Sequence, residues 1–272
     1  MIMVSMNNLS WPTCVLLGIL LGLALVAADR SVDERNGAET SGGQGAQDAS
    51  NDGAPDSSGS GSDAPDETIT DGSPTTTDPN GTYALTLTFD DGPHPTYTPQ
   101  ILDLLEQYEA TAVFCVVGEQ VRAHPEIVRR IVDDGHALCN HTDSHDEELA
   151  QRDDDMIEHE IEVTDAAIDA AVGTDVEVRY FRQPNTFVKP AVAGVVADHG
   201  LTPLDWTVDP RDWSRPGSAS IVQGVLNKVQ PGAIVLLHDG GGDRSQTVTA
   251  LGQILDALSR AGYGYVLPGA DT

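Results

Sequence analysis

The amino-acid sequence predicts an α/β fold for residues 83–272, in which helices cover a parallel sheet. Segments typical of strands alternate with segments typical of helices throughout this range. Clusters of charged and polar residues come directly after several predicted strands, at the edge where α/β barrels carry their active sites. A stretch of roughly 190 residues also suits one domain with a single core.

The first predicted strand is Tyr83–Phe89, because its polar and apolar residues alternate as they do in a half-buried strand. The strand has to end before Gly92-Pro93, since proline lacks the N–H that a strand ladder needs. Similar runs predict strands at Thr111–Val117, His136–Cys139, Val178–Phe181, Pro203–Val208, Ala233–His238 and Tyr263–Leu267. Helical segments lie between them, at Pro99–Tyr108, Pro125–Asp134, Asp146–Val172, Pro190–His199, Ser218–Val229 and Val248–Ala261. Cys115 and Cys139 fall in two adjacent predicted strands, where an exported protein could join them in a disulfide. We expect them to be unpaired, because cross-strand disulfides fit poorly in parallel sheets.

Two adjacent carboxylates, Asp90 and Asp91, stand where the first strand ends. Burying such a pair is costly unless a cation lies beside it, and a metal ion would serve. An ordinary acidic turn at Asp-Asp-Gly-Pro is the other interpretation of this sequence.

Two histidines four residues apart, His141 and His145, follow the strand predicted at His136–Cys139. Their imidazoles can converge on one ion, although surface histidines also reach this spacing by chance. One aspartate and two histidines with an open coordination position would form a hydrolytic metal site rather than a closed structural one. Asp90 would then be free to act as a base.

Five short motifs complete the pattern, and they occur in the order in which one enzyme family carries them. They are Thr88-Phe89-Asp90-Asp91-Gly92-Pro93, His141-Thr142-Asp143-Ser144-His145, Arg182-Gln183-Pro184, Asp209-Pro210-Arg211-Asp212-Trp213 and Leu236-Leu237-His238-Asp239. Together they resemble the motifs of the NodB-type polysaccharide deacetylases, carbohydrate esterase family 4, over residues 83 to 268. The resemblance implies a distorted, incomplete (β/α) barrel with a single catalytic domain, in agreement with the predicted alternation.

The resemblance also implies a divalent metal held by Asp91, His141 and His145. Zinc suits such a set with an open position, and cobalt or nickel would also be accepted. Asp90 would be the general base, and Arg182 would pair with it and help to keep it ionised.

His238 would be the general acid, oriented by an aspartate of the fourth motif. We expect Asp212 to do this rather than Asp209. Taken alone, each of these two aspartates, like Arg182, could equally form a surface ion pair.

The third motif departs from the family pattern Arg-x-Pro-Tyr-Gly, because Asn185 and Thr186 follow Pro184. The residue at the tyrosine position usually gives its backbone N–H to an oxyanion hole, and Asn185 keeps that N–H. The missing ring removes a wall of a sugar subsite, which affects the choice of substrate more than the chemistry. Trp206, Trp213 and Leu237 are candidates for the wall of the acetyl and sugar pocket. Each could equally be a core residue, and for Trp206 the core is the favoured place.

Three functions remain open from the sequence. The first is a metal-dependent hydrolase that removes acetyl groups from N-acetylated amino sugars of an extracellular or cell-surface polysaccharide. The second is an O-acetyl (xylan-type) esterase or a non-glycan amidase of the same superfamily, suggested by the altered Asn185-Thr186 loop. The third is a non-catalytic glycan-binding surface domain.

Composition suggests where such an enzyme works. The chain has 43 acidic and 14 basic residues, and residues 83–272 alone hold 31 and 12 of them, so the excess is not confined to a tail. An acidic, lysine-poor surface is typical of a halophile's protein, whose self-repulsion molar salt screens, although an acidic mesophilic domain is the alternative. If the protein comes from a halophile, we expect its substrate to be another acetylated envelope glycan rather than ordinary peptidoglycan. The absence of a basic patch argues against nucleic-acid binding.

Residues 1–28 predict an export signal or a membrane anchor. Cys14–Ala28 is an unbroken apolar and small-residue run that ends in a plausible cleavage site, but no Lys or Arg precedes it. Lengthened by residues 9–13, the run would be an uncleaved anchor. Residues 29–82 predict a disordered acidic linker, with a glycosylation sequon at Asn80. The protein is therefore expected to be secreted or anchored on the outer face of the membrane, in an oligomeric state that the sequence does not predict.

Overall fold

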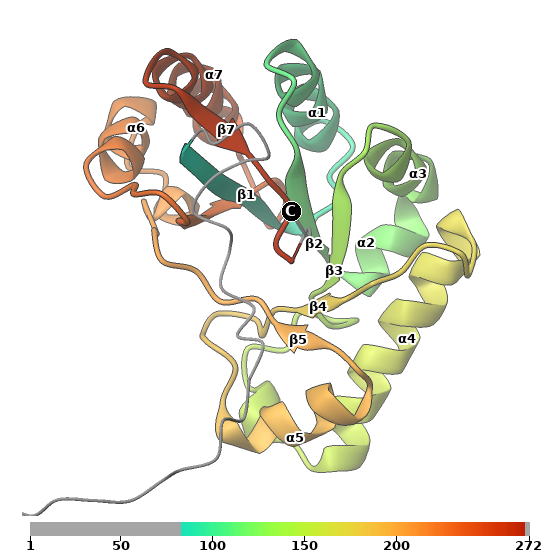
Figure 1. The fold of residues 1–272 in the computed structure, drawn as a ribbon. Helices are drawn as coiled ribbons and strands as arrows, with labels where there is room; N and C mark the ends of the chain where they lie inside the picture. Colours follow the sequence, from blue (N-terminus) through green and yellow to red (C-terminus); the bar gives the residue numbers. More distant parts are fainter. Residues whose placement is uncertain (1–82, 270–272) are drawn as a thin grey trace, which may run out of the picture. The chain divides into compact units, whose positions relative to one another are not determined.

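One curled sheet of parallel strands organises residues 83–269, the part of the chain that the computed structural model describes (Figure 1). Its strands are β1 (Tyr83–Gly92), β2 (Ala112–Val116), β3 (Ala137–Asn140), β4 (Tyr180–Phe181), β5 (Thr202–Pro203), β6 (Ile234–His238) and β7 (Tyr263–Tyr265). They lie in the order β5-β4-β3-β2-β1-β6, and β7 pairs with the beginning of β1. The expectations for residues 1–28 and 29–82, including the sequon at Asn80, fall outside the described range.

Helices cover the outside of this sheet (Figure 1). They are α1 (Tyr97–Gln107), α2 (Gly118–Ala123), α3 (Pro125–Asp133), α4 (Asp154–Val172), α5 (Pro190–Asp198), α6 (Ser218–Leu226) and α7 (Ser245–Arg260). The strand order runs from β5 to β6 without closing, so the sheet is a half-barrel. The predicted α/β fold, a distorted and incomplete (β/α) barrel in a single domain, is confirmed.

The strand β1 lies in the middle of the sheet, between β2 and β6, and is buried on both faces rather than half-buried as its alternation predicts. Its threonines tolerate burial because their hydroxyls find backbone acceptors. Thr88 Oγ1 donates to the carbonyl of Val235 at 2.8 Å, and Thr86 Oγ1 donates to that of Val266 at 2.9 Å. The polar face of β1 therefore faces the interior of the half-barrel without an unpaired hydroxyl.

The structure departs from the predicted elements in three places. The helix predicted from Asp146 begins only at Asp154, because the Asp153 side chain caps it by accepting from Met156 N, and a 3₁₀ turn at Leu149–Gln151 precedes it. The strand predicted at Pro203–Val208 shrinks to β5 and an isolated bridge at Val208. The short helix α2 was not expected at all.

The main hydrophobic core lies between the sheet and the helices α1, α3, α4, α6 and α7. The stacked rings of Phe89 and Phe114, 5.2 Å apart between centroids, join β1 to β2 within it. Cys115 and Cys139 face each other in register on β2 and β3, and both are buried and free, as predicted. Within residues 83–269, no helix combines the length and the apolar composition that crossing a membrane requires.

The carboxyl ends of five neighbouring strands, from β4 to β6 in the sheet, bring the sequence motifs together. In the ladder, Asp90 of β1 pairs with His238 of β6 on one side and with Cys115 of β2 on the other. The next strands end at Asn140 and Phe181, so His141 and Arg182 begin the loops at the same edge. Parallel strands thus place residues from far apart in the chain at one site.

Candidate active site

A cavity of about 540 Å³ opens at the carboxyl edge of the sheet. Its lining includes most of the predicted site residues: Asp90, Asp91, His141, His145, Asn185, Asp209, Trp213 and His238. Arg182 and Asp212 lie just behind this wall, and each makes an ion pair with a residue of the lining.

The adjacent carboxylates Asp90 and Asp91 point to different partners because the backbone changes direction between them. Asp90 still pairs in the β1 ladder, whereas Asp91 lies at a register shift and has a left-handed φ of 73°. Gly240 lets the loop after β6 approach closely, since a Cβ there would lie 2.0 Å from the carbonyl oxygen of Asp91. The bulge therefore separates the two carboxylates into two environments.

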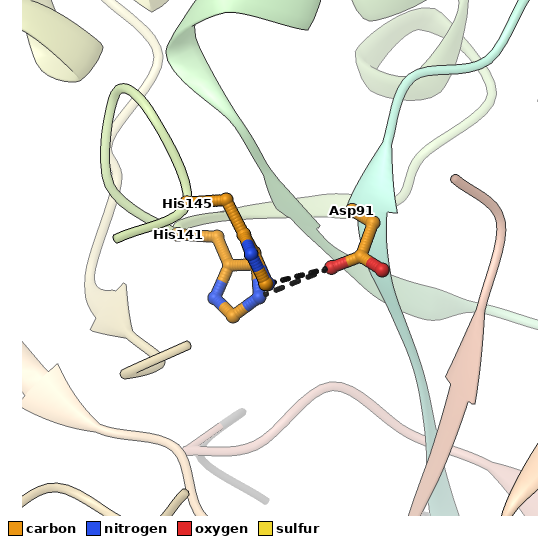
Figure 2. Close-up of side chains that lie close together, drawn as sticks. All are labelled: Asp91, His141 and His145. Carbon is orange, nitrogen blue, oxygen red and sulfur yellow. Dashed lines mark ion pairs between the residues drawn. The ribbon is translucent and has the colours of Figure 1, made fainter. Parts of the chain in front are cut away.

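Asp91 and the two histidines form one group of possible metal ligands. Figure 2 shows both imidazoles directed at the same carboxylate oxygen, Asp91 Oδ1, which lies 3.1 Å from His145 Nε2 and 3.5 Å from His141 Nε2. One ligand atom from each residue lies within 4.8 Å of the others. Burial alone would raise the pKa of Asp91, but the contacts with the two histidines hold that pKa well below its ordinary value.

The tautomer of His141 fits a role as a metal ligand. Its Nδ1 lies 2.7 Å from the carbonyl oxygen of Arg182, and because a carbonyl only accepts, Nδ1 carries the proton. The lone pair of Nε2 is thereby left facing Asp91 and His145. An oriented imidazole of this kind, together with an Asp-His-His donor set, suits a divalent transition metal such as zinc.

Asp90 forms a buried ion pair with Arg182. The distance between Asp90 Oδ1 and Arg182 Nη1 is 2.7 Å, and the arginine side chain is fully buried. The same Nη1 donates to Thr88 Oγ1, Nε donates to the Leu204 carbonyl, and the guanidinium lies 5.6 Å from the Trp206 ring centroid. The second oxygen of Asp90 lies 3.9 Å from His141 Nε2, so this carboxylate borders the metal group.

His238 is paired with Asp212, as we expected. His238 Nδ1 lies 2.7 Å from Asp212 Oδ1, while Asp212 Oδ2 accepts from the His238 backbone N–H and from Thr247 Oγ1. Burial lowers the pKa of His238, but the contact with Asp212 and the nearby charges of Asp91 and Asp90 together outweigh it and raise the pKa to about 9. The other aspartate, Asp209, accepts instead from the backbone N–H of Arg211 at 2.6 Å.

Only some of the residues that were candidates for the pocket wall line the cavity. Trp213 is 45 % exposed and lines the cavity, as does Trp206. Leu237 lies in the main core, and Leu236 lines the cavity in its place. Because strand side chains alternate, Leu236 shares the face of His238, and the period of the strand would have indicated this. Pro184 is buried behind Asn185, which is exposed at the rim with a left-handed φ of 66°.

Several lining residues were not expected from the sequence: Val117, Glu119, Gln120, Ser144, Glu147, Gln183, Gly241 and Arg244. Among these residues, Arg244 brings a positive charge close to a candidate metal ligand, since its Nη2 lies 3.8 Å from Asp91 Oδ2. Its Nη1 donates to the carbonyl of Trp213. Its position in the loop after β6, at the edge that carries the other motifs, was the available signal.

Comparison with known proteins agrees with this geometry. The family description "Polysaccharide deacetylase" matches residues 77–204. A peptidoglycan-N-acetylglucosamine deacetylase of Bacillus cereus is 42 % identical over 190 residues, which cover 69 % of this chain and 87 % of the relative. The chain belongs to the polysaccharide deacetylase family.

A second relative and a solved structure are also similar to this chain. A chitooligosaccharide deacetylase of Rhizobium leguminosarum bv. trifolii is 43 % identical over 188 residues, covering 65 % of this chain and 86 % of the relative. The family 4 carbohydrate esterase of Streptomyces lividans, solved with acetate, superposes with a TM-score of 0.62 at 30 % identity, covering 68 % and 92 % of the two chains. The predicted membership of carbohydrate esterase family 4 is therefore confirmed, and the protein is a polysaccharide deacetylase, a hydrolase.

Proposed function

We propose that this polysaccharide deacetylase depends on a divalent metal, and that it removes acetyl groups from N-acetylated amino sugars of an extracellular or cell-surface glycan. One observation carries the proposal: the Asp91–His141–His145 group lies between two ion pairs, Asp90–Arg182 and His238–Asp212, around one cavity. Amide hydrolysis needs a base, an acid and a stabilised oxyanion, and these groups supply them.

Asp91, His141 and His145 would hold the metal, with zinc as the expected ion and cobalt or nickel as acceptable ones. When bound, such an ion acidifies water and polarises a carbonyl. The protein's part is to present three ligand atoms on one side of the cavity, and the orientation of His141 by the Arg182 carbonyl is the structural support for that part.

Asp90 is the general base of the proposed reaction. Its contact with Arg182 keeps a carboxylate at the buried end of the cavity, where an unpaired charge would be costly. The Asp90 oxygen that does not contact Arg182 is directed toward the metal ligands and is the one that takes the proton of the attacking water.

His238 is the general acid that protonates the departing amine. Its pKa of about 9 keeps the imidazole protonated near neutral pH, and Asp212 fixes the ring through Nδ1 so that Nε2 carries the proton to be transferred. The backbone N–H of Asn185 contributes to the oxyanion hole, and Trp213 provides an exposed aromatic surface for a sugar ring.

Oligomers of N-acetylglucosamine are the first substrate class to examine, because similar proteins are named for chitooligosaccharide and for peptidoglycan N-acetylglucosamine. The acidic, lysine-poor composition supports a protein that works in high salt, and the apolar run at residues 14–28 supports secretion or anchoring on the outer face of the membrane.

The proposal is tested by acetate release from N-acetylglucosamine oligomers in molar salt, before chelation, after chelation and after zinc is restored. We expect activity to disappear with chelation and to return with zinc. Activity that persists without metal would contradict the metal dependence.

An O-acetyl esterase is the second candidate, favoured by the Asn185-Thr186 loop and by Phe187 beside it, whose exposed ring packs on Trp206. Acetylated xylan in the same assay separates the two activities. A protein that binds these glycans without releasing acetate from any of them would instead be a non-catalytic binding domain.

A further inference from the structure

The loop that carries both histidine ligands is held in an unfavourable conformation. Thr142 and His145 have left-handed φ values of 65° and 57°, and neither is glycine. Such conformations raise the energy of the loop, and they persist only where the surroundings impose them. The loop therefore needs contacts outside itself to keep His141 and His145 directed at Asp91.

Glu160, a buried residue of α4, provides such contacts. Its Oε2 accepts from the backbone N–H of Asp143 at 2.9 Å and from that of Ser144 at 2.8 Å, and its Oε1 accepts from Ser144 Oγ at 2.8 Å. One carboxylate thus satisfies three donors in the segment between the two histidines. Hydrogen bonds to a charged acceptor are stronger than those between neutral groups, and the buried Glu160 carboxylate is shielded from water.

A second contact of α4 fixes the beginning of the same loop. Asn140 Nδ2 donates to the Ile161 carbonyl and to Asp165 Oδ1, while Asn140 Oδ1 accepts from the Thr142 backbone N–H. Arg122 adds a bidentate ion pair to Asp143 from α2, but Arg122 is largely exposed. Glu160 is therefore the buried group that spans the middle of the loop.

We propose that Glu160 is a positioning residue for the metal site: through Asp143 and Ser144 it holds His141 and His145 in the arrangement that binds the metal. This inference rests on the proposed metal-dependent function. Glu160 does not line the cavity, and its effect passes entirely through the loop.

Zinc affinity of the full chain, measured by competition with a chromophoric chelator, tests the proposal, and the Co²⁺ absorption spectrum reports the ligand geometry. Glu160→Ala removes all three acceptor contacts, and we expect zinc to bind about 10–100-fold more weakly, with an altered Co²⁺ spectrum. Glu160→Gln should keep zinc affinity within about threefold of wild type. The glutamine oxygen can accept both backbone N–H groups, and the glutamine NH₂ can donate to Ser144 Oγ. Asp169→Asn, which also replaces a carboxylate of α4 with an amide but at an exposed position outside both groups of possible metal ligands, is the control and should match wild type.

Wild-type affinity in a folded Glu160→Ala protein would overturn the proposal, as would equal losses in the Ala and Gln variants. If Glu160→Ala does not fold, Ser144→Ala removes one of the three contacts and should weaken zinc binding about threefold, and an unchanged affinity there would also overturn it. A wild-type protein that binds none of zinc, cobalt and nickel would instead contradict the proposed metal dependence, so the two failures are distinguishable.

Discussion

On the metal side of the cavity, Asp91, His141 and His145 lie on a bulge and a loop, and two of the three have left-handed φ values. On the proton-transfer side, Asp90 and His238 have regular strand backbones and lie opposite each other in the register of β1 and β6. Each has a buried side chain of opposite charge beside it, Arg182 or Asp212. The metal side is thus defined by backbone conformation, and the proton-transfer side by charge pairing.

Because of this difference, the two sides should respond to different substitutions. Weakening a ligand or the backbone that carries it should reduce metal affinity first and activity as a result. Replacing a charged partner should alter protonation, and hence the pH dependence, while metal stays bound. The substitutions that follow separate the two sides, in descending order of expected effect.

The largest effect should come from His141→Ala on the metal side. Because one of three protein ligands is lost, we expect metal to be removed by dialysis, and acetate release at moderate metal concentration to fall by roughly 10³-fold or more. Metal content and acetate release are measured on the same preparation. His159→Ala, at an exposed position of α4, is the control and should keep both. Full activity in dialysed His141→Ala would contradict the ligand assignment.

A change confined to the proton-transfer side should follow from Asp212→Asn. His238 acts only when protonated, so wild-type activity should decline as pH rises through its pKa of about 9. Without the Asp212 charge, burial lowers that pKa, and the alkaline limb of kcat/KM should move down by about one to three pH units. Metal affinity should not change.

Asp209→Asn is the matched control for that substitution, since Asp209 contacts the Arg211 backbone instead of His238. It should leave the alkaline limb in place, and a shift in this variant but not in Asp212→Asn would reverse the assignment.

The pH dependence of stability offers an independent check of the His238–Asp212 pair. The pKa of folded His238 lies above its ordinary value of 6.5, so the pair stabilises the fold fully below pH 6.5. That stabilisation is lost as pH rises through about 9, and thermal unfolding should show a smaller loss over this window in Asp212→Asn.

The smallest effect should come from the rim, where Trp213 is exposed. Trp213→Ala removes a surface on which a sugar ring can stack, so KM for oligomers should rise about fivefold with little change in kcat. Steady-state kinetics on oligomers of increasing length provide the measurement. A fall in kcat with unchanged KM would show that Trp213 acts on the chemistry rather than on binding.

The sequence predicted the centre of the site better than its surroundings. Asp90, Asp91 and His238 were predictable because parallel strands bring their carboxyl ends to one edge, so a polar cluster after each strand has few other places to lie. Asp212 was preferred over Asp209 as the partner of His238, and in the structure Asp212 Oδ1 lies 2.7 Å from His238 Nδ1.

What the sequence did not predict depends on packing between distant segments. Glu160 reaches the histidine loop only because α4 packs beside it, and Thr86 and Thr88 are buried because acceptors from β6 and from the chain after β7 reach their hydroxyls. Propensity alone extended α4 back to Asp146, whereas the Asp153 cap sets its start.

The division of labour between Asp90 and Asp91 is the central claim, and Asp90→Asn tests it most directly. Zinc binding and acetate release should be measured on one preparation of this variant, in molar salt. We expect one equivalent of zinc to bind with wild-type affinity while acetate release falls by about 10²–10⁴-fold, the usual contribution of a general base. A variant that loses zinc together with activity, or that keeps its activity, would contradict the separation of the two carboxylates into a base and a metal ligand.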